Sequence, residues 1–228
     1  MIEKKYLAPN GCTLFSLTVG LIAMQQIVNG NYIQACWLIT LCMVFDLFDG
    51  SLARKFGAFS DFGAELDSLV DFLCFGIAPA FLAYNMLLIQ KPLIGGILCI
   101  FFVISAVSRL AKFNTNLTNL EVKHDFKGLP VPAAAALVVS YIIFAEQIPH
   151  KMFISNLIAI ILLSSLLMIS NMHFRPIKPK DSNLFEKILI ALLLVASVQY
   201  ASYIYFPLCL LFFSKNLILN LGKKYQKK

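Results

Sequence analysis

A long uncharged run begins close to the N-terminus and reads YLAPNGCTLFSLTVGLIAMQQIVNGNYIQACWLITLCMVF, residues 6–45. Its forty residues include no Asp, Glu, Lys or Arg. A helix that crosses the hydrocarbon core of a bilayer needs about 20 predominantly apolar residues. The run is therefore long enough for two membrane helices, and Gly30-Asn31 near its middle predicts the turn between them.

Five further uncharged runs follow along the chain: 72–90, 92–108, 128–145, 152–174 and 188–214. The composition agrees, because the 228 residues are 59% hydrophobic and 14% charged, whereas a soluble domain carries about 25% charged residues. Such hydrophobicity also excludes a disordered chain. We expect an all-α fold, a polytopic membrane helix bundle with no room for a separate soluble domain.

Lys and Arg are distributed asymmetrically over the segments between these runs. With a cytoplasmic N-terminus, sixteen of the 19 basic residues fall on the cytoplasmic side, in segments 1–8, 54–61, 109–127, 172–187 and the C-terminal tail. This positive-inside bias predicts that both termini are cytoplasmic, which requires an even number of spans. We therefore interpret 188–214 as a helical hairpin and predict about eight transmembrane helices. The net charge of +7 suits contact with anionic lipid, and the hydropathy favours a membrane rather than nucleic acid as the partner.

Acidic residues are concentrated in one segment, since six of the 12 lie within residues 46–71. Asp46 and Asp49 are three apart, and Gly50 and Ala53 follow on the same helical face. Gly63, Asp67 and Asp71 are spaced by four and share a face of the next helix. Because the two helices run antiparallel, we expect four carboxylates, those of Asp46, Asp49, Asp67 and Asp71, to meet just inside the cytoplasmic boundary.

Four carboxylates at this depth need compensation, because each ionised group costs at least ~2.5–3.5 kcal/mol near the centre of a membrane helix. They can be protonated, pair with bases such as Arg54 and Lys55, or bind cations. Carboxylates suit Mg²⁺, Mn²⁺ or Ca²⁺, and two such ions can clamp a phosphate. A cation or proton transporter with a carboxylate relay is the alternative from another class. We interpret Asp61 and Glu65 as ordinary helix-end acids.

The pattern D-x-x-D-G-x-x-A-R-x₈-G-x₃-D-x₃-D resembles the signature of the CDP-alcohol phosphotransferases, and this chain fills every fixed position of it between Asp46 and Asp71. The resemblance implies a six-helix membrane core, usually homodimeric. It also implies transfer of a phosphatidyl-type group from a CDP-linked donor to an alcohol, with release of CMP.

The roles implied by the resemblance are assigned position by position. It implies that two divalent cations, Mg²⁺ or Mn²⁺, are held by Asp46, Asp49, Asp67 and Asp71, and that Asp71 is the catalytic general base. It implies that the residues which bind the nucleotide of the CDP-lipid are Asn10, Thr13, Gly50, Ala53, Arg54 and Gly63.

Three further stretches resemble the phosphatidylserine synthase branch of the family: Leu7–Thr13, Arg109–Asn114 and Phe126–Pro132. The resemblance covers roughly residues 7–180. We take residues 1–180 as the phosphotransferase membrane domain, with the hairpin and basic cytoplasmic tail in 181–228. It implies L-serine as acceptor and CDP-diacylglycerol, or a CDP-linked ether lipid, as donor. Candidate serine-binding bases are Arg109, Lys112, Lys127 and Arg175.

An acceptor such as glycerol phosphate or inositol phosphate is the alternative within the family. We expect a multi-pass protein of the cytoplasmic membrane, with its active site facing the cytoplasm.

Overall fold

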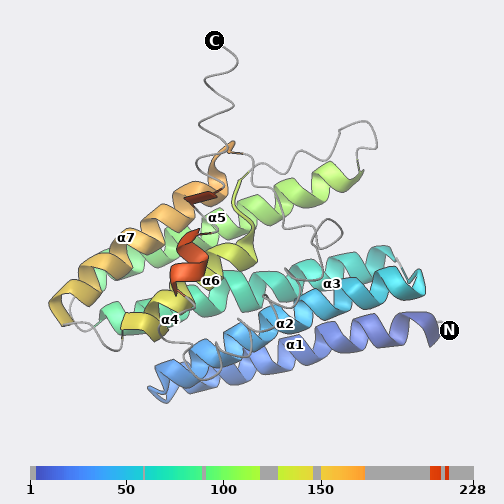
Figure 1. Cartoon of the computed structure of the whole chain (residues 1–228), viewed down its shortest axis with the longest axis horizontal. Coiled ribbons are helices and arrows are strands. Elements are labelled where there is room, and N and C mark those ends of the chain that lie inside the picture. Colours follow the sequence, from blue (N-terminus) through green and yellow to red (C-terminus); the bar gives the residue numbers. More distant parts are fainter. Residues whose placement is uncertain are drawn as a thin grey trace, which may run out of the picture.

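The computed structural model describes residues 4–58, 60–88, 91–118, 128–145, 150–172, 206–211 and 214–215. Within these ranges the ordered elements are all helical, and the long helices lie side by side along the long axis of the molecule (Figure 1). The expected all-α bundle is therefore confirmed. Helix α1 begins, α2 ends and α3 begins at the same end of the bundle (Figure 1).

The first uncharged run forms two helices, α1 (Lys4–Val28) and α2 (Tyr32–Phe56), joined by a tight turn. Gly30 has a φ of +78°, a left-handed conformation that glycine adopts without strain. The amide of Gly30 donates to Ile27 O (3.0 Å) and that of Asn31 to Gln26 O (2.9 Å). These are the two hydrogen bonds of a Schellman motif, which satisfy the last carbonyls of α1. The predicted turn at Gly30-Asn31 is confirmed.

The next span starts earlier than its uncharged run. Helix α3 (Asp61–Asp71), a π-helical segment η1 (Phe72–Ile77) and α4 (Ala78–Leu88) follow one another without a break. The run 72–90 therefore marks only the apolar part of a longer helix, and the acids of α3 lie inside the span. Ser60 caps the helix, since its Oγ accepts from the Gly63 amide at 3.0 Å.

The π-helical segment packs closely against α1. The thiols of Cys42 on α2 and Cys74 on η1 lie 3.4 Å and 3.6 Å from the carbonyl oxygen of Ser16. A Cβ added to Gly20 would lie 2.5 Å from Cys74 Sγ, so even an alanine there would require a neighbouring group to shift. Segments of π-helix often occur at functional sites. Because η1 begins directly after Asp71, its position indicates that the neighbouring acids form such a site.

Three more helices complete the described core: α5 (Pro92–Thr118), α6 (Val131–Ala145) and α7 (His150–Ile169). Helix α5 continues ten residues beyond its uncharged run, while α7 ends before residue 174. Backbone hydrogen bonds join the residues just before α6 to the end of α7. Gly128 N donates to Met172 O at 2.8 Å, and Leu129 N donates to Leu167 O at 3.0 Å.

Within the described residues, five helical spans are long and apolar enough to cross a bilayer, and α6, with 15 residues, is a shorter apolar helix. Large apolar side chains such as Val28, Leu47 and Leu93 are exposed on the outside of the bundle, where a bilayer would cover them. The chain is thus a multi-pass membrane protein. Of the predicted C-terminal hairpin, only 206–211 and 214–215 are described, so the total of eight spans and the division at residue 180 stay predictions.

Candidate functional site

Three of the four predicted metal ligands meet between α2 and α3. Carboxylate oxygens of Asp46, Asp49 and Asp67 all lie within 4.8 Å of one another. Asp49 is buried, with 6% of its surface exposed, and the other two are half-buried. The antiparallel arrangement expected from the spacing thus brings these acids together. We refer to Asp46, Asp49 and Asp67 as the acidic triad.

Asp71 lies beside the acidic triad rather than within it. It follows Asp67 by one helical turn, and its carboxyl group is within hydrogen-bonding reach of Asp46. Asp71 is also half-buried and stands at the junction of α3 with the π-helical segment. It is therefore placed to act next to an ion held by the triad.

The donor set of the triad fits a hard divalent cation. Two unit negative charges about 4 Å apart repel by roughly 1 kcal/mol in water and about 4 kcal/mol near a protein surface. Three carboxylates within 4.8 Å therefore favour a bound cation that removes this repulsion. All three donors are carboxylate oxygens, which suit Mg²⁺, Mn²⁺ or Ca²⁺. The triad can hold a divalent cation.

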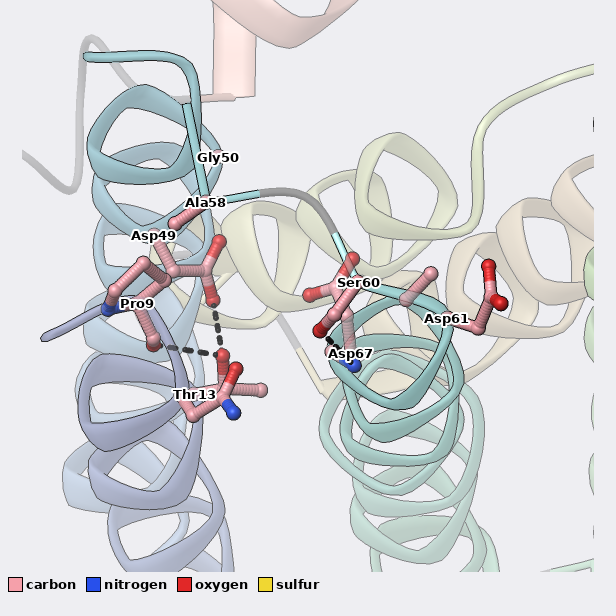
Figure 2. Close-up of a pocket in the computed structure, with 11 residues that line it drawn as sticks. Pro9, Thr13, Asp49, Gly50, Ala58, Ser60, Asp61 and Asp67 are labelled. Carbon is pink, nitrogen blue, oxygen red and sulfur yellow. Dashed lines mark hydrogen bonds between the residues drawn. The ribbon is translucent and has the colours of Figure 1, made fainter. Parts of the chain in front are cut away.

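A cavity of about 400 Å³ lies against the triad and is walled by α1, α2 and the start of α3 (Figure 2). Figure 2 shows Asp49 on one side of it and Asp67 on the other. The cavity is lined by Pro9, Asn10, Thr13, Asp49, Gly50, Ala58, Ser60, Asp61, Gly63, Ala64 and Asp67. A volume of this size falls within the range of small-molecule sites.

Four of the six predicted nucleotide-binding residues line this cavity: Asn10, Thr13, Gly50 and Gly63. Gly63 leaves room for its neighbours, because a Cβ there would lie 3.0 Å from Ser60 Oγ and 3.1 Å from Asn10 Oδ1. Ala53 and Arg54 belong to the last turns of α2, and their side chains lie outside the described part of the structure. Asp61, expected to be an ordinary helix-end acid, is exposed at the edge of the cavity.

Thr13 makes a contact that the sequence did not indicate. Its Oγ1 lies 3.0 Å from Asp49 Oδ2 and 3.1 Å from the carbonyl oxygen of Pro9 (Figure 2). The first distance links α1 to α2 across 36 residues of chain. No periodicity in the sequence relates two positions so far apart.

The acceptor candidates are separated in the structure. Arg109 on α5 is half-buried, stacks over the Phe113 ring at 5.1 Å and is close enough to Asp71 to interact with it electrostatically. Lys112 is exposed and its Nζ lies 3.4 Å from Asn171 Oδ1, beyond the end of α7. Lys127 and Arg175 lie outside the described residues.

A second contact that the sequence did not indicate joins α3, which carries Asp67 and Asp71, to α5. Asn114 Nδ2 donates to Ser68 Oγ at 3.1 Å, and the Ser68 hydroxyl lies 3.3 Å from Asn114 Oδ1. Ser68 is the neighbour of Asp67, and Asn114 is little more than one turn beyond Arg109. The pair therefore connects the helix of the acids to the helix of the nearest base.

Known proteins resemble the chain over most of its length. The sequence model of the family described as CDP-alcohol phosphatidyltransferase matches residues 6–177. The chain is 35% identical over 199 residues to a CDP-diacylglycerol–serine O-phosphatidyltransferase of Helicobacter pylori (strain ATCC 700392 / 26695), covering 85% of this chain and 82% of the relative.

Two relatives with the same name come from other organisms. The protein of Methanocaldococcus jannaschii is 35% identical over 200 residues, covering 88% of this chain and 87% of the relative. That of Bacillus subtilis (strain 168) is 38% identical over 127 residues, covering 56% of this chain and 70% of the relative. Together with the acidic triad and its cavity, these matches show that the chain belongs to the CDP-alcohol phosphatidyltransferase family.

Proposed function

We propose that this membrane protein transfers the phosphatidyl group of CDP-diacylglycerol to the hydroxyl of L-serine and releases CMP. The observation that carries the proposal is the acidic triad at the wall of a 400 Å³ cavity, in a chain of this family. The names of the relatives support serine as the acceptor. Family membership favours a transferase over a cation or proton transporter.

The donor's cytidine diphosphate occupies the cavity in this proposal, and its hydrocarbon chains extend into the bilayer. Asn10, Gly50 and Gly63 line the space that the nucleotide needs. The two glycines let the ligand approach the helix backbones closely. Ala53 and Arg54 of the motif belong to the same group, with the Arg54 guanidinium as a partner for a phosphate.

Asp46, Asp49 and Asp67 hold a divalent cation, and Asp71 beside Asp46 completes a site for a second one; the proposed ions are Mg²⁺ or Mn²⁺. When bound, such ions neutralise charge on the non-bridging oxygens of the diphosphate. The protein's own contribution is to keep four carboxylates from two helices close together before the substrate arrives.

Asp71 accepts the proton of the serine hydroxyl in the proposed step. The serine oxygen forms a bond to the lipid-side phosphorus while the bond from that phosphorus to the CMP oxygen breaks, and CMP leaves with the electron pair. Arg109, near Asp71, grips the serine carboxylate through charge-assisted hydrogen bonds. Lys112, Lys127 and Arg175 are further candidates for acceptor binding.

The active site faces the cytoplasm in this proposal, with both termini on that side of the cytoplasmic membrane and two copies forming a homodimer. The distribution of Lys and Arg supports this orientation. A CDP-linked ether lipid is a second possible donor, because the cavity residues contact the nucleotide end and not the hydrocarbon chains.

One assay tests the acceptor and the donor together. Purified protein in detergent receives CDP-diacylglycerol, or its ether counterpart, with serine, glycerol 3-phosphate or inositol phosphate in separate reactions, and CMP release is measured. We expect serine-dependent CMP release that stops in excess chelator. Release with a phosphorylated acceptor instead of serine would contradict the acceptor assignment and keep the reaction class.

A further inference from the structure

Thr13 and Asp49 differ from the other polar residues around the cavity, because both are almost completely enclosed. Thr13 lies on the cavity wall but is only 4% exposed, and its partner Asp49 is 6% exposed. A buried hydroxyl and a buried carboxylate both need hydrogen-bond partners. Each is satisfied in part by the other, through the 3.0 Å contact between Oγ1 and Oδ2.

The Thr13 hydroxyl has one hydrogen and two acceptors within reach. One acceptor is the carbonyl oxygen of Pro9, one turn back on α1 at 3.1 Å, and the other is Asp49 Oδ2 at 3.0 Å (Figure 2). A carboxylate is the stronger acceptor, since hydrogen bonds to charged groups are shorter and about twice as strong as neutral ones. The hydrogen therefore goes to Asp49 whenever that group is ionised.

We infer that Thr13 is a positioning residue for Asp49, and that its hydroxyl holds this carboxylate in the orientation needed to bind a divalent cation with Asp46 and Asp67. The inference rests on the proposed function. Carboxylates that bind a metal are commonly held in place by a hydrogen bond from a neighbouring group. Losing such a hydrogen-bond partner typically weakens metal binding 10- to 100-fold. Helix α1 thus contributes to a site whose ligands come from α2 and α3.

The alternative role of Thr13 is a direct contact to the nucleotide, as the family resemblance implies. The two roles make different predictions. A nucleotide contact that is lost raises the KM for the CDP-lipid at every metal concentration. A positioning contact that is lost lowers the affinity for the metal. The KM for the CDP-lipid then returns to the wild-type value when the metal is saturating.

The test measures Mn²⁺ binding by full-length protein in detergent, with no substrate present. The amount of free Mn²⁺ is measured from its electron paramagnetic resonance signal. Thr13→Val removes the hydroxyl at constant shape and is expected to raise the Kd for Mn²⁺ about tenfold. Thr13→Ser keeps the hydroxyl and is expected to stay within about twofold of wild type. Thr13→Ala serves as a second hydroxyl-free variant should the valine protein not fold, with thermal unfolding in chelator as the check on folding.

Thr18→Val is the matched control. Thr18 lies on the same helix and its Oγ1 donates to Leu14 O at 3.0 Å, the same backbone contact that Thr13 makes to Pro9, but it is exposed and its hydroxyl has no described contact with an acid. We expect wild-type Mn²⁺ affinity for this variant. Equal loss in Thr18→Val and Thr13→Val would mean that the helix-backbone contact matters, and would overturn the inference.

Unchanged Mn²⁺ affinity in Thr13→Val and Thr13→Ala, with a raised KM for the CDP-lipid at saturating Mn²⁺, would assign Thr13 to the nucleotide and also overturn the inference. Wild-type protein that binds no Mn²⁺ would instead refute the proposed metal site itself, and the role of Thr13 would fall with it. The two failures are therefore distinguishable.

Discussion

The acidic side of the site, formed by the acidic triad and Asp71, and the proposed acceptor side, formed by Arg109 and Lys112, are built in different ways. The acidic triad comes from α2 and α3, which follow each other in the chain, and its three carboxylates lie within 4.8 Å of one another. The acceptor side depends on α5, where Arg109 approaches Asp71 while Lys112 contacts Asn171 beyond α7. Two helices joined by a short connection place their side chains by local spacing. A base on a distant helix is placed only by the packing of the whole bundle.

The largest expected effect comes from breaking the acidic side. Asp49→Asn removes a charged ligand at the most buried position of the triad, and we expect CMP release to fall below about 1% of wild type, because even outer partners of a metal cost 10- to 100-fold when removed. The assay is CMP release by purified protein with matched folding checked by thermal unfolding.

Glu65→Gln is the control for this variant, since Glu65 is an exposed acid on α3 that does not line the cavity. It should keep wild-type activity. Full activity in Asp49→Asn, or in wild-type protein with excess chelator, would refute the metal-dependent mechanism.

Asp71 joins the two sides, because it lies beside Asp46 and near Arg109. Asp71→Asn removes the proposed proton acceptor, and we expect kcat to fall about 10²- to 10⁴-fold, the usual contribution of general base catalysis. The KM for serine should change little, because a base acts in the transition state. Measured kinetics with serine varied would decide this. An unchanged kcat would remove Asp71 from the chemical step.

Arg109→Ala tests the acceptor side on its own. The loss of a charge-assisted pair to the serine carboxylate should raise the KM for serine about 10- to 100-fold and leave the KM for the CDP-lipid near its wild-type value. Lys112→Ala should have a smaller effect, since the Lys112 ammonium lies against Asn171 and not against the acids. A normal serine KM in Arg109→Ala would mean that another group binds the acceptor carboxylate.

The difference between side chains placed by local spacing and side chains placed by the packing of distant helices also decides what the sequence could predict. The turn at Gly30 and the meeting of Asp46, Asp49 and Asp67 follow from local rules of chain direction and helical spacing. The spacing of Gly63, Asp67 and Asp71 also predicts the helix that begins at Asp61, whereas the uncharged run 72–90 marks only its later, apolar part. The contacts of Thr13 with Asp49 and of Ser68 with Asn114 span 36 and 46 residues. Only the packed bundle reveals them.

The smallest expected effect comes from the contact between Ser68 and Asn114, which tests how the acidic side and the proposed acceptor side are joined. It is a neutral hydrogen bond between half-buried groups, and such bonds contribute about 1 kcal/mol. If the pair only stabilises the bundle, Ser68→Ala and Asn114→Ala should lower thermal stability slightly and leave the kinetics unchanged. If it sets the distance between α3 and α5, either variant should also raise the KM for serine by a few fold, because Arg109 and Asp71 lie on these two helices.

The double variant separates these cases. We expect the double variant to have nearly the same serine KM as either single one, since residues that act through one contact are not additive. The KM for the CDP-lipid is the internal control, because the cavity that binds it is walled by α1, α2 and α3 and not by α5. Additive effects of the two substitutions on the serine KM would mean that Ser68 and Asn114 act independently. The acceptor side would then be positioned by other contacts of α5, and the acidic side would be unaffected by that result.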